Sequence, residues 1–257
     1  MNPAMPLAGW VISFDLWGTL ITHGDRAAAM DWRVTEFARV LGAFGHALPP
    51  SRIRSVVIST DTAAFEEQRA HGTQPIPDGQ VAGFLNSLGI TATAELLTVL
   101  VTVHTHAVLR ACPQTMPRAH AALAAVAGTG ARLVLTSNTL STPGAVHRQL
   151  LDDLDLSAYF DDLLFSGDFG VAKPRPEIFA AVAARAAVAP DRVVHVGDDW
   201  DTDIQGALAA GCRALYYHPR AFAQADVPGI TDFDQLADAL LRIARHQHAG
   251  LAVPEPL

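Results

Sequence analysis

The chain has 257 residues, half of them hydrophobic and 17% charged, and its formal net charge is −8. This balance excludes an intrinsically disordered chain, and the negative charge argues against a surface that binds the phosphate backbone of nucleic acids. The two cysteines have no metal-ligand spacing, and residues 1–10 lack the positive charge that begins a signal peptide. Because the apolar run at residues 96–109 is too short to span a bilayer, we expect a cytoplasmic protein without membrane or nucleic-acid partners.

The first predicted strand is Val11–Phe14, a short run of mainly β-branched and aromatic residues without charge. Asp15 follows at its carboxyl end, and Gly18 and Thr19 then allow a sharp turn. Open α/β sheets place their chemistry at the carboxyl ends of parallel strands. Asp15 is therefore either a functional carboxylate or an ordinary residue that begins a turn, and the rest of the chain has to decide between the two.

Residues 22–111 have a different character, because apolar residues recur there at helical spacing and no strand alternation is evident. In one such series, Phe37, Val40, Leu41 and Phe44 define an apolar face. Prolines and glycines separate the expected helices, which cover residues 26–44, 51–71, 78–88 and 93–109. We predict that this segment is a helical domain inserted directly behind the first strand.

The remaining segment alternates between helices and short apolar strands. The expected helices cover residues 117–127, 143–151, 176–187, 202–210 and 233–245, with Asp232 placed to cap the last one. The expected strands cover residues 132–136, 162–166, 192–196 and 212–217. Such alternation implies right-handed βαβ units, and hence an α/β fold whose parallel sheet is flanked by helices. We assign residues 1–21 and 112–257 to this sheet domain and expect the tail at residues 251–257 to be frayed.

Polar side chains follow other predicted strands at the same edge of the sheet as Asp15. Ser137 and Asn138 offer a hydroxyl and an amide before a helix, where such groups either hold an anionic oxygen or simply begin the turn. Lys173 precedes Pro174 in a turn that leads into a helix, and it is the only lysine of the chain. An ammonium there either remains solvated or neutralises carboxylates or a phosphate.

Four carboxylates follow another strand within six residues: Asp198, Asp199, Asp201 and Asp203. The capping of a helix start explains one or two of them. Four together repel one another unless a cation lies among them, and Mg²⁺ prefers such oxygen ligands. The sequence therefore predicts a Mg²⁺ site at this strand end, with Lys173 as a second positive charge.

Four stretches, in this order, resemble the signature motifs of the haloacid dehalogenase-like (HAD) hydrolase superfamily. They are Phe-Asp-Leu-Trp-Gly-Thr-Leu at residues 14–20, Leu-Thr-Ser-Asn at 135–138, Lys-Pro-Arg-Pro-Glu-Ile-Phe at 173–179 and Val-Gly-Asp-Asp-Trp-Asp-Thr-Asp at 196–203. Each motif is short, but four in order with suitable spacing are specific. The resemblance implies a Rossmann-like core domain, with residues 22–111 as a C1-type α-helical cap. It also implies a hydrolase of a small-molecule substrate, and it leaves open whether the chain is a monomer or a homodimer.

By this resemblance, Asp15 would be the nucleophile that forms a covalent aspartyl intermediate. Ser137 would hydrogen-bond the transferring group, although Thr136 is an alternative for this hydroxyl. Lys173 would steady Asp15 and the charge of the transferring group. The residues implied in substrate binding are Thr19, Ser137, Asn138 and Lys173.

The same resemblance implies how Mg²⁺ would be held. Asp15 and Asp198 would ligate the ion together with the backbone carbonyl of Trp17. Asp199 and Asp203 would hold metal-bound water or Lys173. This set consists of oxygen atoms only, as a Mg²⁺ site requires.

Trp17 departs from the family pattern. Phosphatases of the superfamily carry a second aspartate at this position as general acid and base, whereas an indole cannot exchange a proton at neutral pH. His23, near the start of the cap, is a candidate source of the missing proton. A branch that cleaves phosphonates also lacks the second aspartate, but it needs a cap lysine, and residues 22–111 contain none.

Three functions remain open at this point. We favour a Mg²⁺-dependent phosphatase or phosphotransferase acting on a small phosphorylated metabolite, because the acidic fourth motif makes little sense without a metal. The aromatic residue at position 17 also resembles the 2-haloacid dehalogenases, and Arg39, Arg52 and Arg54 of the cap could hold the carboxylate of such a substrate. The third function is the binding of phosphorylated ligands without turnover, since losing a general acid costs about 10²–10⁴ in rate.

Overall fold

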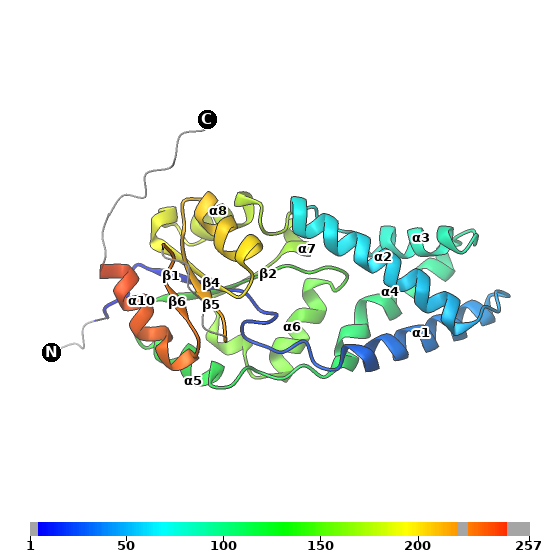
Figure 1. Cartoon of the computed structure of the whole chain (residues 1–257), viewed down its shortest axis with the longest axis horizontal. Coiled ribbons are helices and arrows are strands. Elements are labelled where there is room, and N and C mark those ends of the chain that lie inside the picture. Colours follow the sequence, from blue (N-terminus) through cyan, green and yellow to red (C-terminus); the bar gives the residue numbers. More distant parts are fainter. Residues whose placement is uncertain (1–4, 220–225, 246–257) are drawn as a thin grey trace, which may run out of the picture.

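The computed structural model describes residues 5–219 and 226–245. Its centre is a six-stranded sheet in the order β3-β2-β1-β4-β5-β6, in which every neighbouring pair is parallel (Figure 1). The strands are β1 Val11–Phe14, β2 Arg132–Ser137, β3 Asp162–Phe165, β4 Val193–Gly197, β5 Arg213–Tyr217 and β6 Gly229–Ile230. The predicted α/β fold with a parallel sheet is therefore confirmed. The tail at residues 251–257, for which we expected fraying, lies outside the described residues.

Helices cover both faces of the sheet, as buried parallel strands require (Figure 1). Those on one face are α5 Ala119–Ala127, α6 Gly144–Asp153 and α10 Leu236–Arg245, and those on the other face are α8 Pro176–Arg185 and α9 Gly206–Ala209. Ile12 and Phe14 of β1 pack on the first face and Val11 on the second, and all three are fully buried. The strand therefore lies in the middle of the core and brings Asp15 to the edge of the sheet.

Between β1 and β2 the chain forms a helical cap of its own (Figure 1). Its helices are α1 Arg26–Ala43, α2 Pro50–His71, α3 Pro77–Ser87 and α4 Ala94–His106. They enclose a separate hydrophobic cluster that includes Phe37, Leu41 and Phe84. The two connections to the sheet domain run side by side, since Asp25 N donates to Ala111 O at 2.7 Å. The helical insertion is as predicted, whereas its boundaries at residues 22 and 111 remain a prediction.

The helix predicted at residues 202–210 begins earlier and in a different form. The segment Trp200–Gln205 is a π-helical turn, and α9 continues from it. The Asp199 side chain accepts hydrogen bonds from the backbone N–H groups of Asp201 and Thr202, and so starts the helical backbone before residue 202.

Other differences from the predicted elements are small. The helix expected at residues 93–109 ends at His106 and continues as the 3₁₀ turn Ala107–Ala111. The short helix α7 Ser166–Phe169 and the two-residue strand β6 were not predicted, because elements of this length have no readable periodicity. Among the helices of the described segments, none is long and apolar enough to cross a membrane.

Candidate active site

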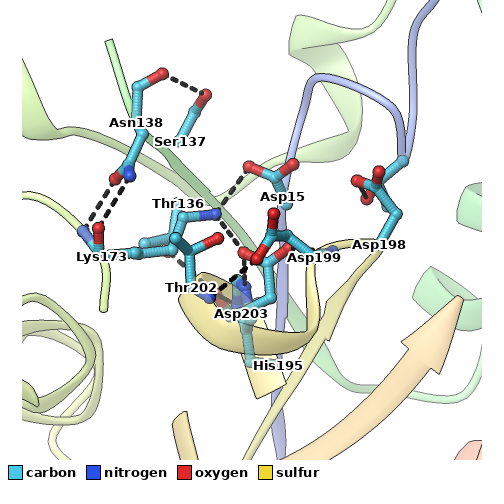
Figure 2. A network of polar contacts seen from close by, with 12 residues as sticks. Asp15, Thr136, Ser137, Asn138, Lys173, His195, Asp198, Asp199, Thr202 and Asp203 are labelled. Atoms are coloured by element: carbon cyan, nitrogen blue, oxygen red, sulfur yellow. Dashed lines mark hydrogen bonds and ion pairs between the residues drawn. The ribbon is translucent and has the colours of Figure 1, made fainter. Parts of the chain in front are cut away.

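The candidate site lies at the carboxyl edge of the sheet. Asp15, Asn138 and the loop after residue 197 follow β1, β2 and β4, which are neighbours in the sheet, so their side chains meet at one place (Figure 2). Lys173 reaches the same place from the loop before α8. A cavity of about 530 Å³ lies between this edge and the cap, and its lining includes Asp15, Lys173 and residues of α1, α2 and α4.

Lys173 is buried between two carboxylates, with 1% of the residue exposed. Its Nζ donates to Asp15 Oδ1 and to Asp203 Oδ1, at 2.6 Å in each case (Figure 2). Asn138 fixes the Lys173 backbone on both sides, since its Oδ1 accepts from the amide N–H (2.8 Å) and its Nδ2 donates to the carbonyl (2.9 Å). Burial lowers the pKa of Lys173, but the two carboxylates outweigh it and raise the pKa above its ordinary value. Of the two interpretations of this lysine, neutralisation of carboxylates therefore holds and solvation is wrong.

Three donors of the chain hold the Asp203 carboxylate. Its Oδ1 accepts from Lys173 and lies 3.2 Å from His195 Nε2, and its Oδ2 accepts from the Asp199 backbone N–H at 3.0 Å. Gly197 makes room for this carboxylate, because a Cβ at that position would lie 2.3 Å from Asp203 Cγ. Despite burial, Lys173 and His195 hold the pKa of Asp203 below its ordinary value, so the group is ionised.

Asp198 approaches the turn that follows β1. Thr19 Oγ1 donates to Asp198 Oδ1 at 2.8 Å, so the predicted substrate-binding threonine is engaged with this carboxylate. Gly18 has a φ of +82°, and a Cβ there would lie 2.4 Å from Asp198 Oδ2. Only glycine satisfies both conditions, which explains its place in the turn. Burial and the neighbouring Asp203 raise the pKa of Asp198 to about 6.

Three carboxylates are arranged as a candidate metal centre. One oxygen from each of Asp15, Asp198 and Asp203 lies within 4.8 Å of the others. Burial raises the pKa of Asp15 above its ordinary value, and although Lys173 counteracts this, the other two carboxylates add to it. One ammonium cannot balance three carboxylates, of which Asp15 and Asp203 are buried and Asp198 is half-buried, so the cluster favours a further cation. An oxygen-only donor set fits Mg²⁺.

Asp199 and Asp201 face the cap. Arg69 of α2 forms an ion pair with each of them, and its Nη2 lies 2.8 Å from Asp201 Oδ2. Asp199 lines the cavity, but its side chain is engaged by this arginine and by the backbone of the π-helical turn. Its predicted contact with metal-bound water stays a prediction.

The two candidate hydroxyls of the second motif have different partners. Thr136 Oγ1 forms a hydrogen bond with Ser13 Oγ (2.8 Å) inside the sheet, away from the cavity. Within the described residues, Ser137 Oγ has one hydrogen bond, a longer one of 3.3 Å to the carbonyl of Asn138 (Figure 2). Both residues are fully buried, and of this segment only Asn138 lines the cavity. These hydrogen bonds favour Ser137 over Thr136 as the hydroxyl that can turn toward a bound ligand.

Trp17 lines the cavity and is held on two sides. Its indole N–H donates to His147 Nε2 at 3.2 Å, and its ring stacks on His23 with 5.7 Å between the ring centroids. Burial lowers the pKa of His147 to about 4, so its ring is neutral and can accept this bond. His23 also lines the cavity, where burial and Arg26 lower its pKa.

The cap arginines in the cavity are not the expected ones. Arg39 and Arg54 form ion pairs with Glu36 and Asp31, and together with Arg52 they lie outside the cavity lining. The arginines that line it are Arg26, Arg33 and Arg69.

Arg33 of α1 was missed, although its sequence position carried a signal. It falls four residues before Phe37, on the face of α1 that packs into the cap. Its Nη1 bonds to His104 Nδ1 at 3.1 Å and its Nη2 pairs with Asp61, whereas its buried Nε has no partner in the described part of the chain. An arginine on the otherwise apolar face of the predicted helix would have indicated a buried polar residue of the cap.

The chain belongs to the haloacid dehalogenase-like hydrolase family, which matches residues 11–211. It is 34% identical over 100 residues to a phosphoserine phosphatase of Thermus thermophilus, covering 39% of each chain. It is also 34% identical over 124 residues to a phosphoglycolate phosphatase of Salmonella paratyphi A, covering 46% of this chain and 48% of the relative. The chain thus spans less than half the length of these curated relatives.

Solved structures share the fold over almost their whole length. A HAD phosphatase from Thermococcus onnurineus has a TM-score of 0.63 at 20% identity and covers 90% of this chain and 97% of its own. A 2-haloacid dehalogenase from Pseudomonas syringae pv. Tomato also has a TM-score of 0.63, at 25% identity, and covers 91% and 98%. The fold is therefore common to phosphatases and dehalogenases, and the choice between these activities depends on the site.

Proposed function

We propose that this hydrolase is a Mg²⁺-dependent phosphatase or phosphotransferase that uses Asp15 as nucleophile on a small phosphorylated metabolite. The observation that carries the proposal is the cluster of Asp15, Asp198 and Asp203, in which a single ammonium pairs with the buried Asp15 and Asp203. Asp15 and Asp198, with the backbone carbonyl of Trp17, would hold the ion, and Asp203 would hold Lys173. When bound, Mg²⁺ would supply the positive charge that these carboxylates and a phosphate group both need.

In the proposed reaction an oxygen of Asp15 forms a bond to phosphorus while the bond from phosphorus to the leaving oxygen breaks. The leaving group departs with the electron pair, and an aspartyl phosphate remains on Asp15. Water then attacks phosphorus, inorganic phosphate leaves, and the carboxylate is restored. Lys173 orients Asp15 through the 2.6 Å bond to Oδ1, and Ser137 would hydrogen-bond the phosphate oxygens.

Trp17 limits the leaving groups that this site can handle. Its indole N–H is engaged by a neutral His147, and it has no proton to give at neutral pH. The substrate then needs a leaving group that departs without protonation, such as the carboxylate of an acyl phosphate, or a proton from elsewhere. His23, which stacks on Trp17 in the cavity, is the candidate donor on this chain.

The side of α1 that lines the cavity, which we call the cap wall, carries Arg26 and Arg33 and favours a substrate with a second anionic group. Arg26 lines the cavity, and no ion-pair partner for it is found within residues 5–219 and 226–245. Arg33 lies on the same face of α1, where it is buried and forms an ion pair with Asp61. The names of two relatives specify phosphoserine and phosphoglycolate, which carry a carboxylate besides the phosphate. In a molecule of this kind the phosphate would lie at the floor of the cavity, formed by Asp15, Lys173 and Asp203, and the carboxylate at the cap wall.

Dehalogenation is the second candidate, favoured by Trp17 and by the likeness to a 2-haloacid dehalogenase. Asp15 would then attack carbon and displace halide, which needs no proton. This reaction does not explain the carboxylate cluster, because one lysine suffices to orient a single nucleophile. Binding of a phosphorylated ligand without turnover is the outcome if neither reaction occurs.

The test is a panel of phosphate esters, acyl phosphates and 2-haloacids, assayed with and without Mg²⁺. We expect Mg²⁺-dependent phosphate release that is abolished in Asp15→Asn, with an unchanged circular dichroism spectrum. Beryllofluoride, an aspartyl-phosphate mimic, should attach to wild type and not to Asp15→Asn. Calorimetry should show one Mg²⁺ site that Asp198→Ala removes. Halide release without Mg²⁺ would replace the proposal by dehalogenation, and ligand binding without any product would replace it by the binding function.

A further inference from the structure

A row of buried polar side chains crosses the three central strands beneath the site. Ser13 on β1, Thr136 on β2 and His195 on β4 are fully buried, and Ser13 and His195 are paired in the sheet register. Ser13 Oγ lies 2.8 Å from Thr136 Oγ1 and 2.9 Å from His195 Nδ1. All three share the face of the sheet that α8 covers, where the neighbouring strand residues are apolar. Polar groups are costly in such a place, so the row calls for an explanation.

His195 joins this row to the catalytic edge. Its Nε2 lies 3.2 Å from Asp203 Oδ1, the same oxygen that accepts from Lys173 at 2.6 Å (Figure 2). Lys173 in turn donates to Asp15. A continuous chain of hydrogen bonds therefore runs from the interior of the sheet through His195, Asp203 and Lys173 to the proposed nucleophile.

The chemistry of its partners determines the state of the His195 ring. Oδ1 of Asp203 accepts from Lys173 Nζ and Oδ2 accepts from the Asp199 backbone N–H, so the carboxylate meets His195 as an acceptor and His195 Nε2 must carry the hydrogen. On the other side of the ring, Nδ1 lies 2.9 Å from Oγ of Ser13, whose hydroxyl donates to Thr136 Oγ1. Phe179 of α8 packs edge-on against the ring, with 5.0 Å between the centroids, and restricts its rotation. The ring is thus held with Nε2 toward Asp203 and Nδ1 toward Ser13.

We propose that His195 is a positioning residue, whose Nε2–H fixes the Asp203 carboxylate and through it places the Lys173 ammonium against Asp15. Lys173 has a flexible four-carbon stem, so its ammonium stays where its acceptors are held. The backbone N–H of Asp199 holds Oδ2 of Asp203, and His195 is the only side chain besides Lys173 that the hydrogen bonds of the described residues place on Oδ1. Without His195 the carboxylate can rotate, and the lysine loses its second anchor. The expected effect of His195 on the reaction rate rests on the proposed function, whereas its effect on the position of Lys173 does not.

A matched pair of substitutions separates this role from simple packing. The amide nitrogen of glutamine occupies the place of imidazole Nε2, whereas that of asparagine occupies the place of Nδ1. His195→Gln therefore keeps a donor for Asp203, and His195→Asn keeps only a partner for Ser13. Both variants remove the ring, and asparagine leaves only a slightly larger void than glutamine.

The readout is the side-chain ammonium of Lys173, which gives a single ¹⁵N resonance because the chain has no other lysine. We expect this resonance and its slow hydrogen exchange to persist in His195→Gln, and to shift and exchange faster in His195→Asn. In the phosphatase assay kcat should fall about 10–100-fold in His195→Asn with little change in KM, and His195→Gln should recover most of that loss.

Several results would overturn this role. Equal lysine spectra in wild type and His195→Asn, or an equal loss in both variants, would mean that the ring only fills space. If the variants do not fold, the ¹⁵N signals of His195 in the wild-type protein still decide, because a hydrogen on Nδ1 instead of Nε2 contradicts the proposed donor. If no phosphorylated substrate is turned over, the proposed function fails, but the lysine spectra continue to test His195.

Discussion

The floor and the cap wall of the cavity are built in opposite ways. On the floor, Asp15, Lys173 and Asp203 are almost fully buried, and Lys173 bonds both carboxylates at 2.6 Å. On the wall, Arg26 is exposed without an ion-pair partner in the described part of the chain, and Arg33 has one N–H group without a partner. The floor is thus preorganised and short of positive charge, whereas the wall offers the exposed guanidinium of Arg26. Chemistry needs the first arrangement and recognition of an anionic ligand needs the second.

The elements that carry the two regions explain this difference. The ends of parallel strands and the π-helical turn are anchored in the sheet core, so the floor residues have little freedom. The wall is one side of the α1 helix, on which Arg26, Met30 and Arg33 recur at helical spacing. Arg69 links the regions, since it extends from the cap to Asp199 and Asp201. Substitutions in the floor should therefore affect the chemistry, and substitutions in the cap wall should affect ligand binding.

The largest effect should come from restoring the proton donor that the floor lacks. Trp17→Asp places a carboxyl where the ester oxygen departs, and we expect a gain of about 10²–10⁴ in kcat on phosphate esters with poor leaving groups. Acyl phosphates, which need no protonation, should gain little. Trp17→Asn is the matched control, because it removes the same ring and the same bond to His147 without adding an acid. A folded, Mg²⁺-competent Trp17→Asp no faster than Trp17→Asn would contradict phosphatase chemistry on this floor.

Removing the single ammonium of the floor should destabilise the protein without Mg²⁺. Lys173→Met leaves Asp15 and Asp203 buried without their cation, and breaking such a pair costs about 3–5 kcal/mol. We expect a lower Tm by calorimetry and partial recovery with Mg²⁺. Arg175→Met, in the same turn, breaks only an exposed ion pair with Glu177 and serves as control. An unchanged Tm in Lys173→Met would mean that the carboxylates do not depend on the lysine.

A substitution on the cap wall should affect binding and leave the chemistry intact. Arg26→Ala should raise KM about tenfold, equivalent to roughly 1.4 kcal/mol, for substrates with a second anionic group, with kcat nearly constant. Substrates without that group should be unaffected. Arg39→Ala, on the same helix but paired with Glu36 outside the cavity, is the control. If kcat fell as well, the division between wall and floor would be wrong.

The smallest effect concerns pH. The pKa of Asp198 rises from its ordinary value of 3.8 to about 6 in the folded protein, so between these values the folded state binds more protons than the unfolded state. The Mg²⁺-free protein should therefore lose stability as pH rises from about 4 to about 6, and stabilisation by Mg²⁺ should grow over the same range. Asp198→Asn should weaken both trends in Tm measured against pH. Mg²⁺ stabilisation that is equal at pH 5 and pH 7.5 would argue against Asp198 as a ligand.

The sequence by itself determined the sheet, the helical insertion and the family. These follow from local periodicity and from short motifs at strand ends, which depend on near neighbours in the chain. Gly18 and Gly197 belong to such motifs, and the close approach of Asp198 and Asp203 supplies the physical reason for both. The convergence of Asp15 and Lys173 could also be expected, since parallel strands end at one edge.

Only the tertiary structure decided which polar residues within the strands and helices support the site or line the cavity. Ser13 and His195 lie within apolar strands, and nothing near them in the sequence reveals that they meet each other across β1 and β4. In the cap, the exposed Arg39 and the buried Arg33 belong to the same helix, and the face that each occupies depends on the packing of the other cap helices. These contacts join residues as many as 182 positions apart, and such distances in sequence leave no local pattern.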